Sequence, residues 1–282
     1  MDQVYDYNRR RWEALVSAKA LFTRPWLDLD EQSARERIDE WHVLGNVAGM
    51  DVLCLAGGGG QQSAAFALLG ARVTVLDISP GQLAQDLAAA AHYGLEVTTV
   101  EGDMRDLSVF SEDSYDLVWH PYSLNFVPDC RVVFRQVARV LRAGGLYHFG
   151  AANPFAVGMG TADWSGEGYT LRRQYVEGAE ITYQDEEWVF REDPSALERI
   201  DGPREYRQTL GRLLNGLVDN GFLLARIQET ASHEPVLDAE PGEWEHFAAF
   251  LPPWIWFWTV YRPDVRPTED WQGAGPTGRG EG

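Results

Sequence analysis

Short apolar runs of strand type alternate with helical patterns between residues 51 and 149, and this alternation constrains the fold more than any other feature of the chain. The strand-type runs lie at 51–55, 72–76, 95–100, 115–119 and 146–149. Strands that alternate with helices form a parallel sheet covered by helices on both faces. We therefore expect an α/β fold with ligand-binding residues where the strands end.

Glycines directly follow the first of these strands. Residues Ala56 to Gly60 lie between the strand that ends at Leu55 and a helical pattern that begins at Gln61. Glycine lets a backbone approach a ligand closely and adopt positive φ, and the first turn of the following helix presents unpaired N–H groups. The segment therefore suits a nucleotide-like or carboxylate-bearing cofactor, although a tight turn alone also explains a run of glycines.

Acids end the next two strands. Asp77 lies about twenty residues after the glycines, where a carboxylate can accept both hydroxyls of a ribose, and Ile78 follows it. Asp103 lies between Gly102 and Met104, where a side chain and a backbone amide can hold an adenine. A helix N-cap is the alternative for each aspartate. Three consecutive strand ends with suitable residues favour a binding site.

These segments resemble the motifs of class I S-adenosylmethionine-dependent methyltransferases in order and spacing: residues 52–60, 75–79, 101–104, 115–118 and 141–145. Residues 53–56 with Gln61 and Gln62 are also similar to a bacterial subfamily of small-molecule type. The resemblance implies an α/β fold with a seven-stranded, mostly parallel sheet in the order 3-2-1-4-5-7-6, whose last strand is antiparallel.

The resemblance also implies S-adenosyl-L-methionine as cofactor and S-adenosyl-L-homocysteine as product. The residues expected to bind the cofactor are Ala56, Gly57, Gly58, Gly60, Gln61, Asp77, Ile78, Gly102, Asp103, Met104 and His120. Cys54 departs from the family, which usually carries there an acid that helps to hold the loop or the methionine end of the cofactor. We expect backbone carbonyls at Ala56 and His120 to hold the methionine amino group instead.

The regular alternation stops after the fifth strand. We expect a helical cap over 1–45, the cofactor-binding core over 46–152, an insertion over 153–204, the C-terminal part of the core with its last helix and two strands over 205–262, and a disordered tail over 263–282. The insertion is too long for a plain connection, so we expect it to cover the substrate. Trp254, Trp256 and Trp258 alternate along the last strand, so they are expected to share one face and to lie mainly in the core.

The methyl acceptor is expected to be a small molecule. His120 directly follows the fourth strand, and it acts either as a general base near neutral pH or only as a residue that shapes the pocket. The candidate contacts to the acceptor come from the N-terminal helices, the loop after the fourth strand and the insertion: Tyr5, Trp12, Tyr122, Asn125 and Trp164.

Composition limits the partners. The net charge of −19, from 24 basic and 43 acidic residues, repels polyanions, so nucleic acid is not an expected partner. No stretch approaches the roughly 20 apolar residues of a membrane span, and no signal peptide precedes the first helix. Cys54 and Cys130 are expected to be reduced thiols of a cytoplasmic protein, without a metal site.

Two other functions stay open at this point. An NAD(P)-dependent oxidoreductase also needs glycines after the first strand and an acid after the second, but the third glycine of its fingerprint falls on Ser63. A non-catalytic protein that binds S-adenosylmethionine for regulation needs no acceptor pocket, and the long aromatic insertion argues against it. The motifs are the same for acceptors methylated on oxygen, nitrogen, carbon or sulfur, and for any oligomeric state.

Overall fold

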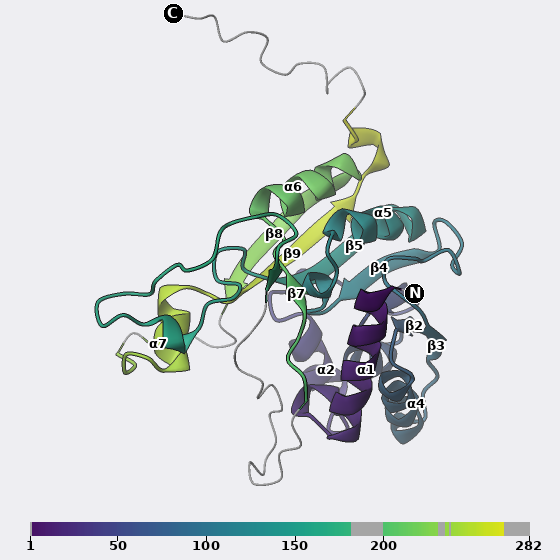
Figure 1. Cartoon of the computed structure of the whole chain (residues 1–282). Coiled ribbons are helices and arrows are strands. Elements are labelled where there is room, and N and C mark those ends of the chain that lie inside the picture. The colour runs from purple at the N-terminus through teal and green to yellow at the C-terminus, as the bar shows by residue number, and fades with distance from the viewer. Residues whose placement is uncertain (1, 182–199, 231–234, 237, 268–282) are drawn as a thin grey trace, which may run out of the picture.

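A computed structural model of the chain describes residues 2–181, 200–230, 235–236 and 238–267. Its centre is a seven-stranded sheet in the order β3-β2-β1-β4-β5-β9-β8 (Figure 1). The strands are β1 (Asp51–Leu55), β2 (Arg72–Asp77), β3 (Thr98–Glu101), β4 (Tyr115–His120), β5 (Leu141–Ala152), β8 (Phe222–Thr230) and β9 (Trp254–Tyr261).

The direction of the strands matches the expected topology. The strands from β3 to β5 pair in parallel, whereas β9 runs antiparallel to both of its neighbours, β5 and β8. β9 and β8 therefore take the places of the seventh and sixth strands of the predicted order. The predicted fold class is confirmed.

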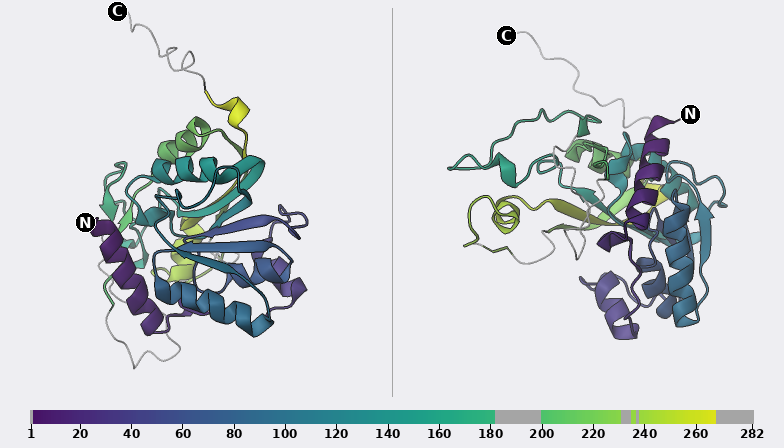
Figure 2. Two further views of the ribbon diagram at one scale, coloured as in Figure 1. Left: turned by 90° about the vertical axis from the view of Figure 1, so that its right-hand side faces the viewer. Right: turned by 60° about the horizontal axis from the view of Figure 1, so that its bottom comes forward.

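Helices cover both faces of this sheet (Figure 2). α3 (Gln62–Leu68) and α4 (Pro80–Tyr93) pack on one face, against the strands from β1 to β3. α5 (Cys130–Val140) and α6 (Leu210–Asp219) pack on the other face, against β5 and β8. α2 (Glu31–Ile38) packs outside α3. The result is the three-layer arrangement that parallel strands with two apolar faces require.

The central strand β1 shows why its loop is fixed in place. Leu53 and Leu55 belong to the apolar cluster that includes α5, whereas Val52 and Cys54 belong to the cluster that includes α3. Successive side chains of a strand point to opposite faces, so β1 is buried on both. β1 also pairs with β2 on one side and with β4 on the other, so its end lies between two other strand ends at the carboxyl edge of the sheet.

The first helix, α1 (Gln3–Ser17), lies beside α4, at the end of the sheet where β1 and β2 finish (Figure 2). The Asp2 carboxylate caps its first turn by accepting backbone hydrogen bonds. Farther along, Glu13 accepts hydrogen bonds from the Ser79 hydroxyl and the Gly81 N–H at the start of α4, at 2.6 and 2.9 Å. These bonds hold one face of α1 against the carboxyl edge of the sheet.

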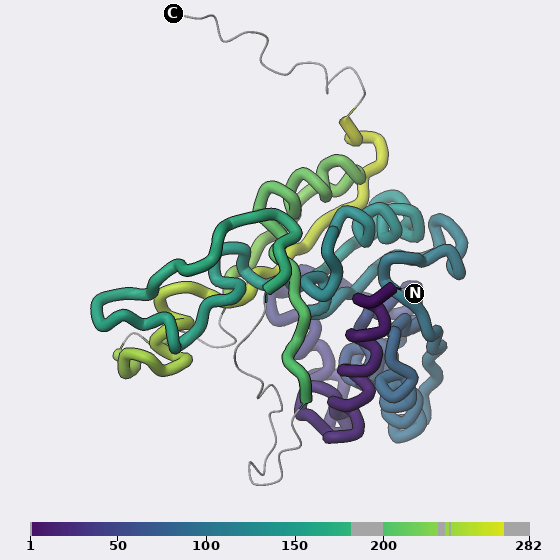
Figure 3. Tube along the Cα trace, viewed as in Figure 1, coloured from purple at the N-terminus to yellow at the C-terminus, as the bar shows by residue number. Residues whose placement is uncertain are grey.

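The chain leaves the core after β5 and returns at α6 (Figure 3). Within this segment β6 (Glu180–Ile181) pairs antiparallel with β7 (Glu205–Tyr206), and the ring of Trp164 packs on α7 (Trp244–Phe250). Residues 182–199 of the predicted insertion lie outside the described residues.

The remaining elements are short. Single-turn 3-10 helices occur at Leu21–Thr23, Leu124–Phe126, Thr161–Asp163 and Pro263–Val265. Of the predicted disordered tail, only residues 263–267 are described. Within the described ranges, no helix has both the length and the apolar character that crossing a membrane requires.

Candidate functional site

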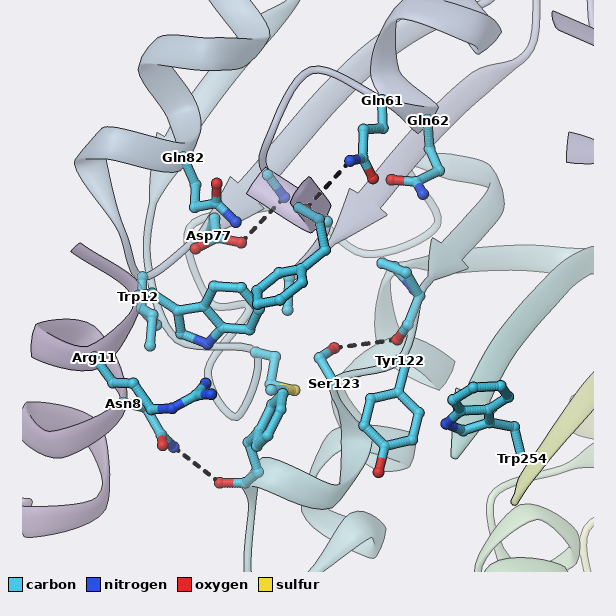
Figure 4. Close-up of a pocket in the computed structure, with 18 of the residues that line it drawn as sticks. Asn8, Arg11, Trp12, Gln61, Gln62, Asp77, Gln82, Tyr122, Ser123 and Trp254 are labelled. Carbon is cyan, nitrogen blue, oxygen red and sulfur yellow. Dashed lines mark hydrogen bonds between the residues drawn. The ribbon is translucent and has the colours of Figure 1, made fainter. Parts of the chain in front are cut away.

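A cavity of about 430 Å³ lies at the carboxyl ends of β1, β2 and β4 (Figure 4). The residues that line it come from α1, the glycine loop, the strand ends and the start of β9: Asn8, Arg11, Trp12, Phe22, Ala56, Gly57, Gly58, Gln61, Gln62, Asp77, Ile78, Gln82, Met104, Pro121, Tyr122, Ser123, Phe126, Trp254 and Trp256. The lining is largely apolar and aromatic. Among these residues, Asp77 is the one carboxylate and Arg11 the one guanidinium.

Asp77 ties β2 to the glycine loop. Its Oδ2 accepts a hydrogen bond from the Gly58 N–H at 3.1 Å, and its Oδ1 accepts one from the Ser79 N–H at 2.9 Å. Burial raises the pKa of Asp77 to about 6, although the backbone hydrogen bonds oppose the increase. Each carboxylate oxygen can accept a further hydrogen bond, so Asp77 is able to bind hydroxyl donors inside the cavity.

The space at Gly58 admits no side chain. A Cβ built there would stand 2.6 Å from the Cβ of Gln82 and 3.1 Å from Oδ2 of Asp77. This crowding comes from the start of α4 and the end of β2, and the conformation of Gly58 itself is not left-handed. The loop therefore forms a cradle whose floor is bare backbone, as a closely bound cofactor requires.

A buried carboxylate on α4 holds the other side of the loop. Asp86 accepts hydrogen bonds from the N–H groups of Gly59 and Gly60, at 3.1 and 3.0 Å, and from the hydroxyl of Ser63. Burial raises the pKa of Asp86 to about 7. Burial raises the pKa of the Cys54 thiol well above its ordinary value, and the nearby charge of Asp86 raises it further. Position 54 is thus neutral, and the carboxylate that holds the loop comes from Asp86, which the sequence did not reveal.

The structure brings together most of the predicted cofactor residues. Those that line the cavity are Ala56, Gly57, Gly58, Gln61, Asp77, Ile78 and Met104. Gly60 and Gly102 lie outside the lining, Gly60 because its N–H points to Asp86 and Gly102 because it packs on the Leu76 side chain.

Asp103 also lies outside the lining. Both of its carboxylate oxygens accept hydrogen bonds from Arg105, with Nε at 3.0 and 2.9 Å and Nη2 at 2.5 Å. Arg105 in turn forms an ion pair with Asp2, at 2.6 Å. The side chain of Asp103 thus links β3 to the start of α1, and only its neighbour Met104 reaches the cavity.

His120 lies in the core, and the structure does not bring its side chain to the cavity. The ring is fully buried, and Nδ1 lies 2.9 Å from the hydroxyl of Tyr147 on β5. Burial lowers the pKa of His120 to about 3, so the ring is neutral at pH 7. A weakly basic imidazole in the core is not positioned as a general base, and His120 is not among the residues that line the cavity.

Two of the predicted substrate residues, Trp12 and Tyr122, line the cavity, whereas Tyr5, Asn125 and Trp164 do not. Both ends of the Asn125 amide bind backbone, since Nδ2 donates to the Tyr206 carbonyl and Oδ1 accepts from the Ala152 N–H.

Trp164 belongs to a separate aromatic cluster. Its ring contacts Tyr169, His246 and Phe250, with centroids 5.2, 4.7 and 6.2 Å away. None of the described residues of 153–204 lines the cavity. The expectation that this segment covers the substrate thus finds no contact in the part that the structure describes.

The start of β9 contributes two aromatic residues that were expected in the core. Trp258 is buried as predicted, but Trp254 and Trp256 are only partly buried and line the cavity. β9 is antiparallel, so its first residues lie at the edge where the parallel strands end. The expected antiparallel direction of the last strand was the signal that could have placed them there.

Tyr122 connects the cavity to a buried acid. Its hydroxyl donates to Oε1 of Glu205 on β7, at 2.8 Å, and Glu205 is fully buried. In the part of the chain that the structure describes, no three histidine, cysteine or acidic side chains are placed together to bind a metal ion.

Comparison with known sequences points to one family. Residues 53–149 match a family described as "Methyltransferase domain". A Bacillus subtilis protein named "Uncharacterized methyltransferase YbaJ" is 36% identical over 185 residues, which cover 65% of this chain and 69% of that protein. A ubiquinone biosynthesis O-methyltransferase of Xanthomonas oryzae is 33% identical over 150 residues, which cover 51% of this chain and 57% of that protein.

Solved structures give the same fold. An S-adenosylmethionine-dependent methyltransferase from Mesorhizobium loti superposes with a TM-score of 0.60 at 23% identity, over 83% of this chain and all of that one. A protein from Listeria monocytogenes described as a member of the same class superposes with a TM-score of 0.58 at 17% identity, over 82% of this chain and 99% of that one. These likenesses support the fold, the relatives in sequence support the family, and the chain belongs to the class I S-adenosylmethionine-dependent methyltransferases, with S-adenosylmethionine as its cofactor.

Proposed function

We propose that this methyltransferase methylates a small molecule that binds in the cavity next to the cofactor. The observation that carries the proposal is the composition of the cavity, in which a carboxylate and a glycine loop at one end continue into an aromatic wall (Figure 4). When bound, S-adenosylmethionine supplies a methyl group activated by a sulfonium. The chain therefore has mainly to align the acceptor and to exclude water.

The end of the cavity at β1 and β2 is proposed to hold the cofactor. Asp77 accepts the ribose hydroxyls with the acceptor capacity that its two backbone bonds leave. Gly58 gives the cofactor access to bare backbone, because a side chain there would collide with α4. Ile78 and Met104 line the cavity as apolar surfaces suited to the faces of an adenine.

The aromatic residues of the cavity are proposed to bind the acceptor. Trp254 and Trp256 come from β9, Trp12 from α1, and Tyr122 and Phe126 from the loop after β4. Rings from three elements form a pocket for a flat, largely apolar molecule, since aromatic side chains offer large rigid contact areas.

For an acceptor that loses a proton, the pair Tyr122 and Glu205 is proposed to supply the base in place of His120. Tyr122 lines the cavity, and its hydroxyl donates to the buried carboxylate of Glu205. The oxygen of Tyr122 accepts the proton of the acceptor while the tyrosine proton passes to Glu205, and after product release the proton returns through the Tyr122 hydroxyl to water in the cavity.

The proposal includes a cytoplasmic location and no nucleic-acid partner. Both cysteines, Cys54 and Cys130, are free and buried thiols, which suits a reducing compartment. The net charge of −19 disfavours binding to a polyanion.

The test is transfer of a labelled methyl group. The purified protein is incubated with S-adenosylmethionine labelled on its methyl group and with a bacterial extract separated into low- and high-molecular-weight fractions. We expect protein-dependent label in one compound of the small-molecule fraction, and loss of that label in Asp77→Ala. Label confined to protein or nucleic acid would contradict a small-molecule acceptor. Cofactor binding without transfer to either fraction would favour the regulatory alternative.

A further inference from the structure

One charged side chain in the cavity has an unused hydrogen-bond donor. Arg11 is only 5% exposed, and its guanidinium points from α1 into the cavity (Figure 4). Its Nε donates to the carbonyl oxygen of Asp201 at 2.9 Å. Its Nη2 is buried and finds no hydrogen-bond partner among the residues that the structure describes.

A buried guanidinium with an unpaired donor carries a free-energy cost. Burial lowers the pKa of Arg11 to about 10, so the side chain is still charged at neutral pH. The charge of the guanidinium is favoured by three nearby residues, Tyr7, Glu205 and Asp201. The hydrogen bond of the guanidinium Nε goes to the backbone carbonyl of Asp201 and not to one of these side chains. The charge is thus maintained in the cavity without an ion-pair partner from the described part of the chain.

The surroundings of Arg11 favour an anionic ligand with two oxygens. It is the one guanidinium among the described lining residues, in a chain whose net charge of −19 otherwise repels anions. Asn8 lies one turn earlier on the same face of α1 and also lines the cavity. A planar guanidinium binds a carboxylate through paired hydrogen bonds, and such charge-assisted bonds are strongest where water is excluded.

We propose that Arg11 binds a carboxylate of a ligand in this cavity. The inference rests on the proposed function, which supplies two sources of that chemistry. One is the carboxylate at the methionine end of the cofactor. The other is a carboxylate carried by the acceptor. Arg11 lies outside residues 53–149, so the family match assigns it no role.

The test uses calorimetry on the full chain with Arg11→Met, which removes the charge and keeps an unbranched apolar side chain. Arg10→Met is the matched control, because Arg10 is an exposed neighbour on the same helix. The probes are S-adenosylhomocysteine, methylthioadenosine (which lacks the amino-acid end), and benzoate or benzamide added to protein loaded with S-adenosylhomocysteine. Arg11→Lys provides a second variant that keeps the charge.

Two results support the proposal and separate the sources. For the cofactor carboxylate, Arg11→Met weakens S-adenosylhomocysteine binding by about 10- to 100-fold and leaves methylthioadenosine binding unchanged. If Arg11 binds a carboxylate of the acceptor, Arg11→Met binds both nucleosides as the wild type does. Benzoate then binds the loaded wild type in preference to benzamide, and it does not bind loaded Arg11→Met. Arg11→Lys is expected to restore part of the lost affinity in either case.

Other results overturn it. Equal weakening of both nucleosides would mean that Arg11 only shapes the pocket. If Arg11→Met binds both nucleosides as the wild type does, and if benzoate binding does not depend on Arg11 either, Arg11 binds no carboxylate. Failure of the wild type to bind either nucleoside would instead contradict the proposed cofactor site. Nucleoside binding by the wild type therefore tests the proposed cofactor site, and binding by the variants tests the role of Arg11.

Discussion

The Asp77 carboxylate accepts a hydrogen bond from the Gly58 N–H at 3.1 Å, so the acid at the end of β2 and the loop after β1 form one unit. A Cβ at Gly58 would come within 3.1 Å of the accepting oxygen and 2.6 Å of the Gln82 Cβ. Any side chain at Gly58 must therefore displace the loop, Asp77 or the start of α4. These three parts border the proposed cofactor position.

Gly58→Ala is expected to weaken S-adenosylhomocysteine binding by at least about tenfold, because one added methyl group is enough to break this arrangement. Isothermal calorimetry measures the change, with circular dichroism as the check on folding. The control is Gly211→Ala on α6, where an added Cβ would meet nothing within 4 Å. Wild-type affinity in a folded Gly58→Ala variant would show that the loop does not contact the cofactor.

Cofactor affinity is expected to depend on pH through Asp77. Burial raises its pKa to about 6, and ribose hydroxyls donate to the ionised carboxylate, so binding favours the charged form. The affinity for S-adenosylhomocysteine should therefore increase about tenfold between pH 5 and pH 7 and then level off. Asp77→Asn should bind more weakly and lack this increase. A wild-type affinity that is independent of pH in this range would argue against contact with Asp77.

Local rules explain why some of the predicted residues line the cavity. Gly58 and Asp77 follow buried strands, and the ends of parallel strands meet at one edge, so their positions follow from the strand pattern alone. Met104 follows in the same way. This reasoning has a limit. The strand pattern predicts where the backbone lies, but it does not predict which group a side chain contacts.

Asp103 and His120 illustrate that limit. Arg105, two residues after Asp103, takes both oxygens of its carboxylate. His120 shares the face of β4 that packs on Tyr147, so its ring enters the core although its backbone lies at the strand end. Competing partners of this kind become visible only when the strands are assembled.

Arg11 shows the other limit, which is docking between elements. The pattern of α1 predicts a helix, but the face that meets the cavity depends on the bonds from Glu13 to the start of α4. Residues 9–11 are three consecutive arginines, and the sequence alone does not show which of them turns inward. Arg10 is exposed, whereas Arg11 is buried.

Asp86 should make the stability of the protein depend on pH. Its pKa is raised from 3.8 to about 7 in the folded chain, so between these values the folded state binds more protons than the unfolded state. The free energy of unfolding therefore falls as pH rises from about 4 to about 7, and the decrease from this group amounts to at most about 4 kcal/mol. Urea denaturation at several pH values measures it.

Asp86→Asn isolates this contribution. The variant keeps the shape and loses the charge, so its stability relative to the wild type should improve steadily from pH 4 to pH 8. At pH 4 it should be the less stable protein, because the amide accepts fewer hydrogen bonds from Gly59, Gly60 and Ser63. A constant difference across this range would show that Asp86 ionises at its ordinary pKa and that the loop is held differently.

Gly150 and Trp256 should be coupled in stability. They are paired across β5 and β9, and a Cβ built on Gly150 would stand 2.7 Å from Cε3 of the indole. Gly150→Ala should therefore push the indole, which lines the cavity, and destabilise the protein by about 1–3 kcal/mol. In the double variant Gly150→Ala with Trp256→Leu the smaller side chain leaves room for the methyl group, so most of that loss should disappear. Denaturation of the wild type, the two single variants and the double variant gives the coupling energy. Additive effects would show that the indole does not rest on Gly150. If the pair is coupled, Gly150→Ala moves only the acceptor end of the cavity. The affinity for S-adenosylhomocysteine should then stay within about twofold of the wild type, while methyl transfer to the small-molecule fraction falls.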